Sequence, residues 1–241
     1  MCLVAEPVAP SSTSFVIHAG AALLALWGLN FMIASYVPVA IQQIESSFWI
    51  FFYHFPSAIN CYLFFTTLMV CAVGFLATRD PRWDQHGRVA GEIGVLAVTI
   101  TLVTGSCWAR MAWGQWWIWD DPRLLSVAIM WATYAGYLML QYQVEDTDKR
   151  RRWTAVYAVL AWINLPIVHY SIQWLGSKSH PQKFQDLSST GSIVGTRWFG
   201  VFAFLVLYSL IYRWKLARDR VHDEAQAILS RVRHMEEGAV S

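Results

Sequence analysis

Charged residues are scarce in this chain. Asp, Glu, Lys and Arg together make up 14% of its 241 residues, whereas hydrophobic residues make up 56% and aromatic residues 15%. A typical soluble domain carries nearly twice that share of charge, about 25%. The composition therefore excludes an ordinary soluble domain and indicates a membrane protein.

Sequence motifs of several enzyme and redox classes are also missing. The four cysteines (Cys2, Cys61, Cys71 and Cys107) form neither a CxxC pair nor a CxxCH sequence. This excludes a thioredoxin-like redox pair and the covalent attachment of a c-type haem. The chain has no Walker A, GxSxG or HExxH motif, so no motif indicates hydrolysis of nucleotides or peptides. Any energy that the protein needs would come from a partner.

Long apolar runs are what the chain has instead. A helix needs about 20 apolar residues to cross ~30 Å of hydrocarbon. We expect spans at residues 15–37, 57–77, 89–108, 124–143, 153–173 and 198–212. The sixth is short, and it spans only if it takes in Ile193 and Val194 and lets Arg197 reach the interface. Because the runs lack the alternation of barrel strands, the sequence predicts an all-α bundle of six transmembrane helices.

The basic residues are distributed unevenly between the two sides of this bundle. Segments 78–88, 144–152 and 213–241 contain three, four and six Lys or Arg residues, and so hold thirteen of the eighteen in the chain. Basic loops are retained in the cytoplasm, so we predict that these segments and both termini are cytoplasmic. The first 14 residues contain no Lys or Arg, and we therefore expect the first run to be a mature helix rather than a signal peptide. The loops 38–56, 109–123 and 174–197 would then face outward.

One of these outer loops contains the sequence WGQWWIWDD, with four tryptophans within seven residues. Trp113, Trp116 and Trp117 are three and four residues apart and would share one face of a helix, with Trp119 nearby. Indole rings gather at the headgroup level of many membrane proteins, so an interfacial belt is one interpretation. A platform for a large planar ligand is the other.

Two histidines in the outer loops are candidate metal ligands. His54 precedes the second predicted span and His180 lies in the last outer loop, so both can approach the tryptophans. Two imidazoles on opposite faces of a ring would fill the axial positions of a haem iron, but the spacing alone leaves this open. His169, three residues after Pro166, is either a competing ligand or a hydrogen-bond partner of a facing helix. The remaining histidines, expected to be solvated on the cytoplasmic side, are His18, His86, His222 and His234.

Four motifs together carry a resemblance to a known family. WGQWWIWD is similar to the WWD signature of the haem-handling proteins of cytochrome c biogenesis, and residues 53–58 (YHFPSA) resemble their YxHxPxA motif. Residues 102–106 (LVTGS) and 164–171 (NLPIVHYS) resemble two further motifs of that group. Six spans in a chain of 241 residues are similar, within the group, to the CcmC-type haem exporter protein C family.

The resemblance implies a protein that binds haem b noncovalently at the periplasmic side of the inner membrane. It implies that His54 and His180 are the axial iron ligands, and that the WWD loop contacts both the haem edge and a haem chaperone. Arg110 and Arg123 flank the loop and are either propionate partners or interface anchors. The residues expected to contact the haem are Trp113, Trp116, Trp117, Trp119, Asp120, Arg110 and Arg123.

The expected partners follow from the same resemblance. They are haem, a haem chaperone of the CcmE type, a small membrane subunit of the CcmD type, and ABC transporter subunits of the CcmA and CcmB types. The ABC subunits would hydrolyse ATP, so the chain itself is expected to be a haem-delivery protein and not an enzyme, and no nucleic acid is expected to bind. Two features depart from the family pattern: Asp121 is an extra residue before Arg123, and the interval from His169 to His180 is one residue longer.

Two other functions stay open. An electron-transfer subunit resembling a cytochrome b would hold its haem by histidines on helices inside the bilayer, and a docking subunit with an aromatic loop would bind no cofactor. We divide the chain into a six-helix membrane domain, 1–214, and a cytoplasmic C-terminal tail, 215–241. In the tail Val221, Ala225, Ile228 and Val232 recur at helical spacing, so it is either an amphipathic helix or a solvated extension.

Overall fold

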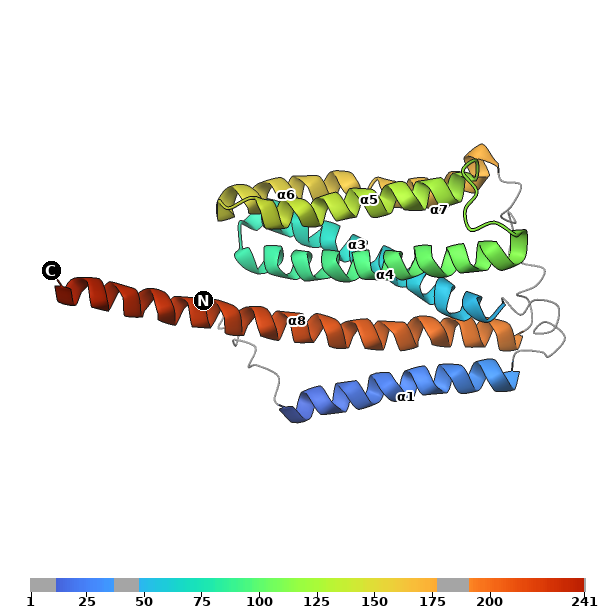
Figure 1. Ribbon diagram of the computed structural model, residues 1–241, viewed down its shortest axis with the longest axis horizontal. Helices are drawn as coiled ribbons and strands as arrows, with labels where there is room; N and C mark the ends of the chain where they lie inside the picture. Colours follow the sequence, from blue (N-terminus) through green and yellow to red (C-terminus); the bar gives the residue numbers. More distant parts are fainter. Residues whose placement is uncertain (1–11, 37–47, 177–190, 241) are drawn as a thin grey trace.

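The computed structural model describes residues 12–36, 48–176 and 191–240, and the regular structure within these ranges is entirely helical (Figure 1). The helices are α1 (Ser12–Tyr36), α3 (Phe48–Thr78), α4 (Pro81–Trp113), α5 (Pro122–Gln143), α6 (Thr147–Ala161), α7 (Asn164–Leu175) and α8 (Gly191–Val240).

Six stretches of the described chain are long and apolar enough to cross a membrane. The prediction of an all-α bundle of six transmembrane helices is therefore confirmed. Five of these spans are longer than the sequence suggested: the second begins at Trp49 rather than at residue 57, the third covers Pro81–Trp113 rather than 89–108, and the sixth covers Ile193–Val221 rather than 198–212. Helix α8 continues without interruption to Val240, so the expected boundary between residues 214 and 215 falls inside a helix.

The fifth span, Thr147–Leu175, is divided into α6 and α7. The break precedes Pro166, which has no backbone N–H to donate to the carbonyl of Trp162 four residues earlier. That carbonyl instead accepts the N–H of Leu165, at 3.0 Å. A tighter turn thus replaces the missing helical hydrogen bond, as backbone groups in lipid require.

The helices lie roughly along the long axis of the molecule (Figure 1). Helix α1 packs against α8, α3 packs against both α4 and α8, and α5 packs against α4, α6 and α7. The loop from α4 to α5 and the end of α7 lie at one end of the bundle, which we call the tryptophan end. The turns from α3 to α4 and from α5 to α6 lie at the other, the basic end, where α8 projects past the other helices. The membrane orientation of the two ends stays a prediction.

The centre of the bundle depends on glycines along one side of α4. A Cβ atom on Gly91 would lie 2.8 Å from the ring of Tyr137, and one on Gly94 would overlap the ring of Phe65. Phe65 in turn stacks on Tyr134 of α5, with ring centroids 3.5 Å apart and planes within 4°. Because small residues let helices in a membrane approach closely, these glycines set the distances between α3, α4 and α5.

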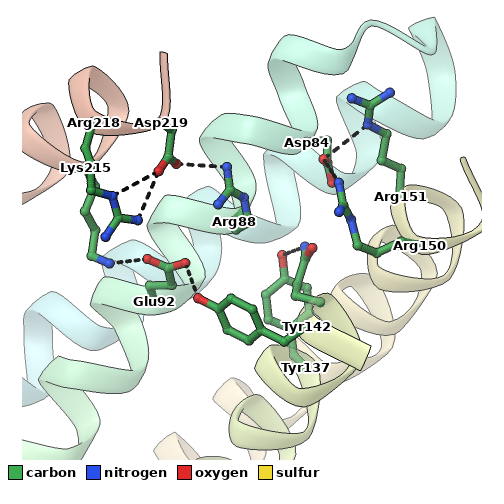
Figure 2. Close-up of polar contacts among 11 residues, drawn as sticks. Asp84, Arg88, Glu92, Tyr137, Tyr142, Arg150, Arg151, Lys215, Arg218 and Asp219 are labelled. Atoms are coloured by element: carbon green, nitrogen blue, oxygen red, sulfur yellow. Dashed lines mark hydrogen bonds and ion pairs between the residues drawn. The ribbon is translucent and has the colours of Figure 1, made fainter. Parts of the chain in front are cut away.

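A charged network ties α8 to the basic end of α4 (Figure 2). Glu92 pairs with Lys215 and also accepts the hydroxyl of Tyr142 at 2.9 Å, although its side chain is only 8% exposed. Asp219 binds Arg88 at 2.8 Å. Buried acids are tolerated only when they are paired, so these contacts explain how α8 carries charge alongside the body of the bundle.

A substitution at Gly94 tests the close approach of α3 and α4. The Gly94→Ala change should lower stability by about 1–3 kcal/mol, because the added methyl group forces the Phe65 ring out of its stack with Tyr134. Gly20→Ala is the matched control, since nothing lies within 4 Å of a Cβ built there. We expect a lower apparent melting temperature in detergent for Gly94→Ala alone, and equal values for the two variants would contradict the packing described here.

Candidate functional site

The tryptophan-rich segment is a loop and not part of a helix. Helix α4 ends at Trp113, and Gly114 takes the left-handed conformation with φ +73°, which favours glycine. Its N–H donates to the carbonyl of Arg110 at 3.1 Å, and the guanidinium of Arg110 binds the Gly114 carbonyl. The prediction that Trp113, Trp116 and Trp117 share one helical face is therefore wrong, because the helix stops between them.

The loop ends at Asp121, which caps α5. Its carboxylate accepts the backbone N–H groups of Arg123 at 3.0 Å and Leu124 at 3.1 Å, and Pro122 occupies the first helical position. Asp121 is only 3% exposed, whereas Asp120 is exposed. The residue that departs from the family pattern thus starts a helix, and Asp120 is the acid that the loop presents.

The four tryptophans of the loop fall into two classes. Trp116 and Trp119 are exposed, at 60% and 78%, whereas Trp113 and Trp117 are half-buried. The rings of Trp117 and Trp119 pack edge to face, with centroids 6.1 Å apart. The indole Nε1 of Trp117 is buried and has no hydrogen-bond partner among the described residues. The loop therefore offers two open indole faces and one buried donor beside them.

His54 lies inside a helix, not in an outer loop as the sequence suggested. It is the seventh residue of α3, and its ring is half-buried against α4. The ring Nδ1 lies 3.1 Å from the carbonyl oxygen of Thr101 and 3.1 Å from the hydroxyl oxygen of Thr104. A Cβ on Gly105 would come within 3.1 Å of the ring, so glycine at this position lets His54 lie against α4.

Trp108 lies on α4 between Thr104, which contacts His54, and the start of the loop. The motifs of the sequence did not single it out. It follows Thr104 by four residues and so lies on the same face of α4. Its ring packs on Trp113, with centroids 5.3 Å apart. The spacing from the LVTGS motif was the signal that could have identified it. Two packed tryptophans thus lie along the last turns of α4, between Thr104 and the end of the helix.

Three arginines lie at the tryptophan end. Arg110 closes the end of α4, as described above, and the guanidinium of Arg123 donates to the backbone carbonyl of His169 at 3.5 Å. The sequence treated Arg197 only as an interface anchor. Its guanidinium lies 5.3 Å from the ring centre of Phe55, the neighbour of His54, and 5.8 Å from that of Trp198. Arg197 is therefore a third cation for the site, held by two aromatic rings.

The remaining candidate residues are placed as follows. His169 is exposed on α7 and packs edge to face against Tyr170. His180 lies outside the described residues. No group of three or more His, Cys, Asp or Glu that could hold a metal occurs within the described ranges. Cys61, Cys71 and Cys107 are free thiols, so the described residues contain no cysteine pair.

Comparison with known proteins gives one consistent match. Residues 7–193 match the family described as CcmC, heme exporter protein C. A heme exporter protein C from Escherichia coli K12 is 28% identical over 182 residues, which cover 76% of this chain and 71% of the relative. One from Bradyrhizobium diazoefficiens is 34% identical over 132 residues, 55% of this chain and only half of the relative's length. A ccmC-like mitochondrial protein of cytochrome c biosynthesis from Marchantia polymorpha is 30% identical over 153 residues, 64% of each chain.

Replacing the two acids of the loop should have sharply different effects on the stability of α5. Asp121→Ala removes the cap of α5 and should cost about 0.5–2 kcal/mol, whereas Asp121→Asn should cost little because Asn caps helices as well as Asp. Asp120→Ala, at the exposed neighbour, is the control. Hydrogen exchange at the amides of Arg123 and Leu124 should accelerate in Asp121→Ala only. Similar acceleration in Asp120→Ala would mean that the cap is assigned to the wrong acid.

Proposed function

The chain belongs to the heme exporter protein C (CcmC) family, and we propose from this that it acts in haem export for the maturation of c-type cytochromes. Its relatives are named as heme exporters and, in one case, as a protein of cytochrome c biosynthesis. Six spans make it a multi-pass membrane protein. In this proposal haem is the cargo, and the protein binds and delivers it without catalysing a reaction on it.

The observation that carries the proposal is the pairing of an exposed tryptophan loop with a helix-held histidine near the same end of the bundle. His54 contacts α4 at Thr104, nine residues before Trp113, which corresponds to about 14 Å along the helix. Trp108 and Trp113 occupy the interval. A large planar apolar ligand that reached from the loop toward His54 would therefore meet aromatic side chains along its length.

In the proposed complex the iron of haem b lies between His54 and His180. Bis-histidine ligation leaves no axial position open to oxygen, which suits a carrier more than an oxidase. His54 comes from a helix and His180 from the segment between α7 and α8.

The residues of the tryptophan end suit the two chemical parts of haem. Trp116 and Trp119 offer open indole faces to the ring, and Trp113 contributes from the end of α4. The propionates would bind Arg110, Arg123 and Arg197. They would also accept the indole N–H of Trp117, which has no partner among the described residues. Asp120 would repel propionates, so we assign it to contact with a basic partner surface.

The proposed partners and location follow from the family. The haem would be delivered to a chaperone of the CcmE type on the periplasmic side of the inner membrane. A CcmD-type subunit and the CcmA and CcmB subunits of an ABC transporter would complete the assembly. The basic end, with the projecting part of α8, would then face the cytoplasm, where ATP is hydrolysed.

The position of His54 also favours a second function, electron transfer by a subunit resembling a cytochrome b. Such proteins hold haem with histidines on helices inside the bilayer, and His54 lies within the second span. The two functions differ in the fate of the haem. A carrier loses its haem to an apo-chaperone, whereas an electron-transfer subunit retains the haem through repeated cycles of oxidation and reduction.

Optical spectra of the purified protein test the ligands. The haem-loaded protein should give a six-coordinate low-spin spectrum in both oxidation states, because two imidazoles are strong-field axial ligands. His54→Ala and His180→Ala should each abolish or shift it, and His169→Ala is the control that should leave it unchanged. A spectrum altered only by His169→Ala would overturn the ligand assignment.

Removal of the exposed indoles tests the loop. The combined change Trp116→Ala and Trp119→Ala should weaken haem binding at least tenfold, a loss of about 1.4 kcal/mol or more, since two large apolar contact surfaces are lost. Trp27→Ala, at a tryptophan of α1 that is 70% exposed, is the control. Haem titration measures the affinity, and transfer to an apo-chaperone measures delivery. Unchanged values for both would leave the loop as an interfacial belt.

A further inference from the structure

The contacts of Nδ1 in His54 indicate whether this ring nitrogen carries a proton. Two oxygen atoms lie 3.1 Å from Nδ1, the carbonyl oxygen of Thr101 and the hydroxyl oxygen of Thr104. Both distances are within the range of an N–H···O hydrogen bond. A neutral imidazole carries one N–H and one lone pair, so its tautomer depends on whether these oxygens accept or donate.

Both oxygens accept. A backbone carbonyl has no hydrogen to donate. The Thr104 hydroxyl has one, and its Oγ1 lies 2.6 Å from the carbonyl oxygen of Ile100 and 3.2 Å from that of Thr101. Neither carbonyl can donate in return, so the hydroxyl hydrogen is used within α4. The hydroxyl therefore faces His54 with a lone pair, and this arrangement favours a proton on Nδ1.

We propose that Thr104 is a positioning residue, which together with the Thr101 carbonyl holds His54 in the Nδ1–H tautomer and so presents the lone pair of Nε2 to the haem iron. The iron as target rests on the proposed function, but the tautomer is a property of the chain without haem. Metal-binding histidines commonly donate their second N–H to such acceptors, which fixes the ring and raises its basicity. Gly105 contributes by letting the ring approach α4.

The first experiment determines the tautomer in the protein without haem. Nitrogen-15 NMR of protein labelled at histidine distinguishes a protonated ring nitrogen from one with a lone pair, and the His54→Ala variant identifies the signal of His54. We expect a protonated Nδ1 and a lone pair on Nε2. A protonated Nε2 would overturn the inference whether or not the protein binds haem.

The second experiment separates positioning from structure. Thr104→Val keeps the shape of the side chain but removes the acceptor, whereas Thr104→Ser keeps the hydroxyl. Thr67→Val is the matched control, because the Thr67 hydroxyl makes the same bond to the carbonyl four residues earlier, at 2.9 Å, on the neighbouring helix α3. We measure haem affinity and the midpoint potential of the bound iron.

Thr104→Val should lower haem affinity by roughly tenfold, the smaller end of the range for such changes, because the Thr101 carbonyl remains. It should also shift the potential upward, since a less basic ligand stabilises ferric iron less. Thr104→Ser should restore both values. An unchanged potential in Thr104→Val, no rescue by serine, or an equal shift in Thr67→Val would overturn the role of Thr104. If the spectrum of the bound haem did not change in His54→Ala, the proposed assignment of His54 as an iron ligand would fail, while the NMR result would still decide the tautomer.

Discussion

Every backbone N–H and C=O group inside hydrocarbon must find its partner within the protein, and the rest of this structure depends on that constraint. It forces the spans into helices and confines irregular backbone to points with replacement hydrogen bonds. Gly114 and Asp121 supply them on the two sides of the tryptophan loop, and the turn before Pro166 supplies them inside the fifth span. The loop can consequently leave helical geometry and turn indole rings outward, which a continuous helix at the same residues could not do.

The close contact of α3 and α4 connects this fold to the candidate site. Glycines on α4 admit the ring of Phe65 near the centre of the bundle and the ring of His54 nearer the tryptophan end. At the second position the contact also places backbone and hydroxyl acceptors of α4 against Nδ1. In both places an aromatic ring of α3 packs against a glycine of α4. This contact sets the distance between the helices and also the orientation of His54, the proposed iron ligand.

The two ends of the bundle have opposite chemistry. The tryptophan end exposes indoles and holds single arginines on aromatic rings or backbone carbonyls. The basic end instead pairs its acids closely, with Glu92 and Asp219 bound to basic residues of α4 and α8 (Figure 2). Charge at the basic end thus attaches α8 to α4, whereas at the tryptophan end the arginines contact backbone carbonyls and aromatic rings.

The sequence by itself determined the architecture, because low charge and runs of about 20 apolar residues permit only membrane helices. It also singled out His54 and the tryptophans as candidates for a site, and their role in binding a ligand stays a prediction. It misjudged the conformation around them, because spacing read across Gly114 suggests a helix that a left-handed residue ends. Only the tertiary structure showed that His54 lies inside α3, that Asp121 is a helix cap, and that Arg197 stacks on Phe55. The physical reason is that periodicity reports which residues share an element, whereas the partner of a side chain is decided by how closely separate helices approach.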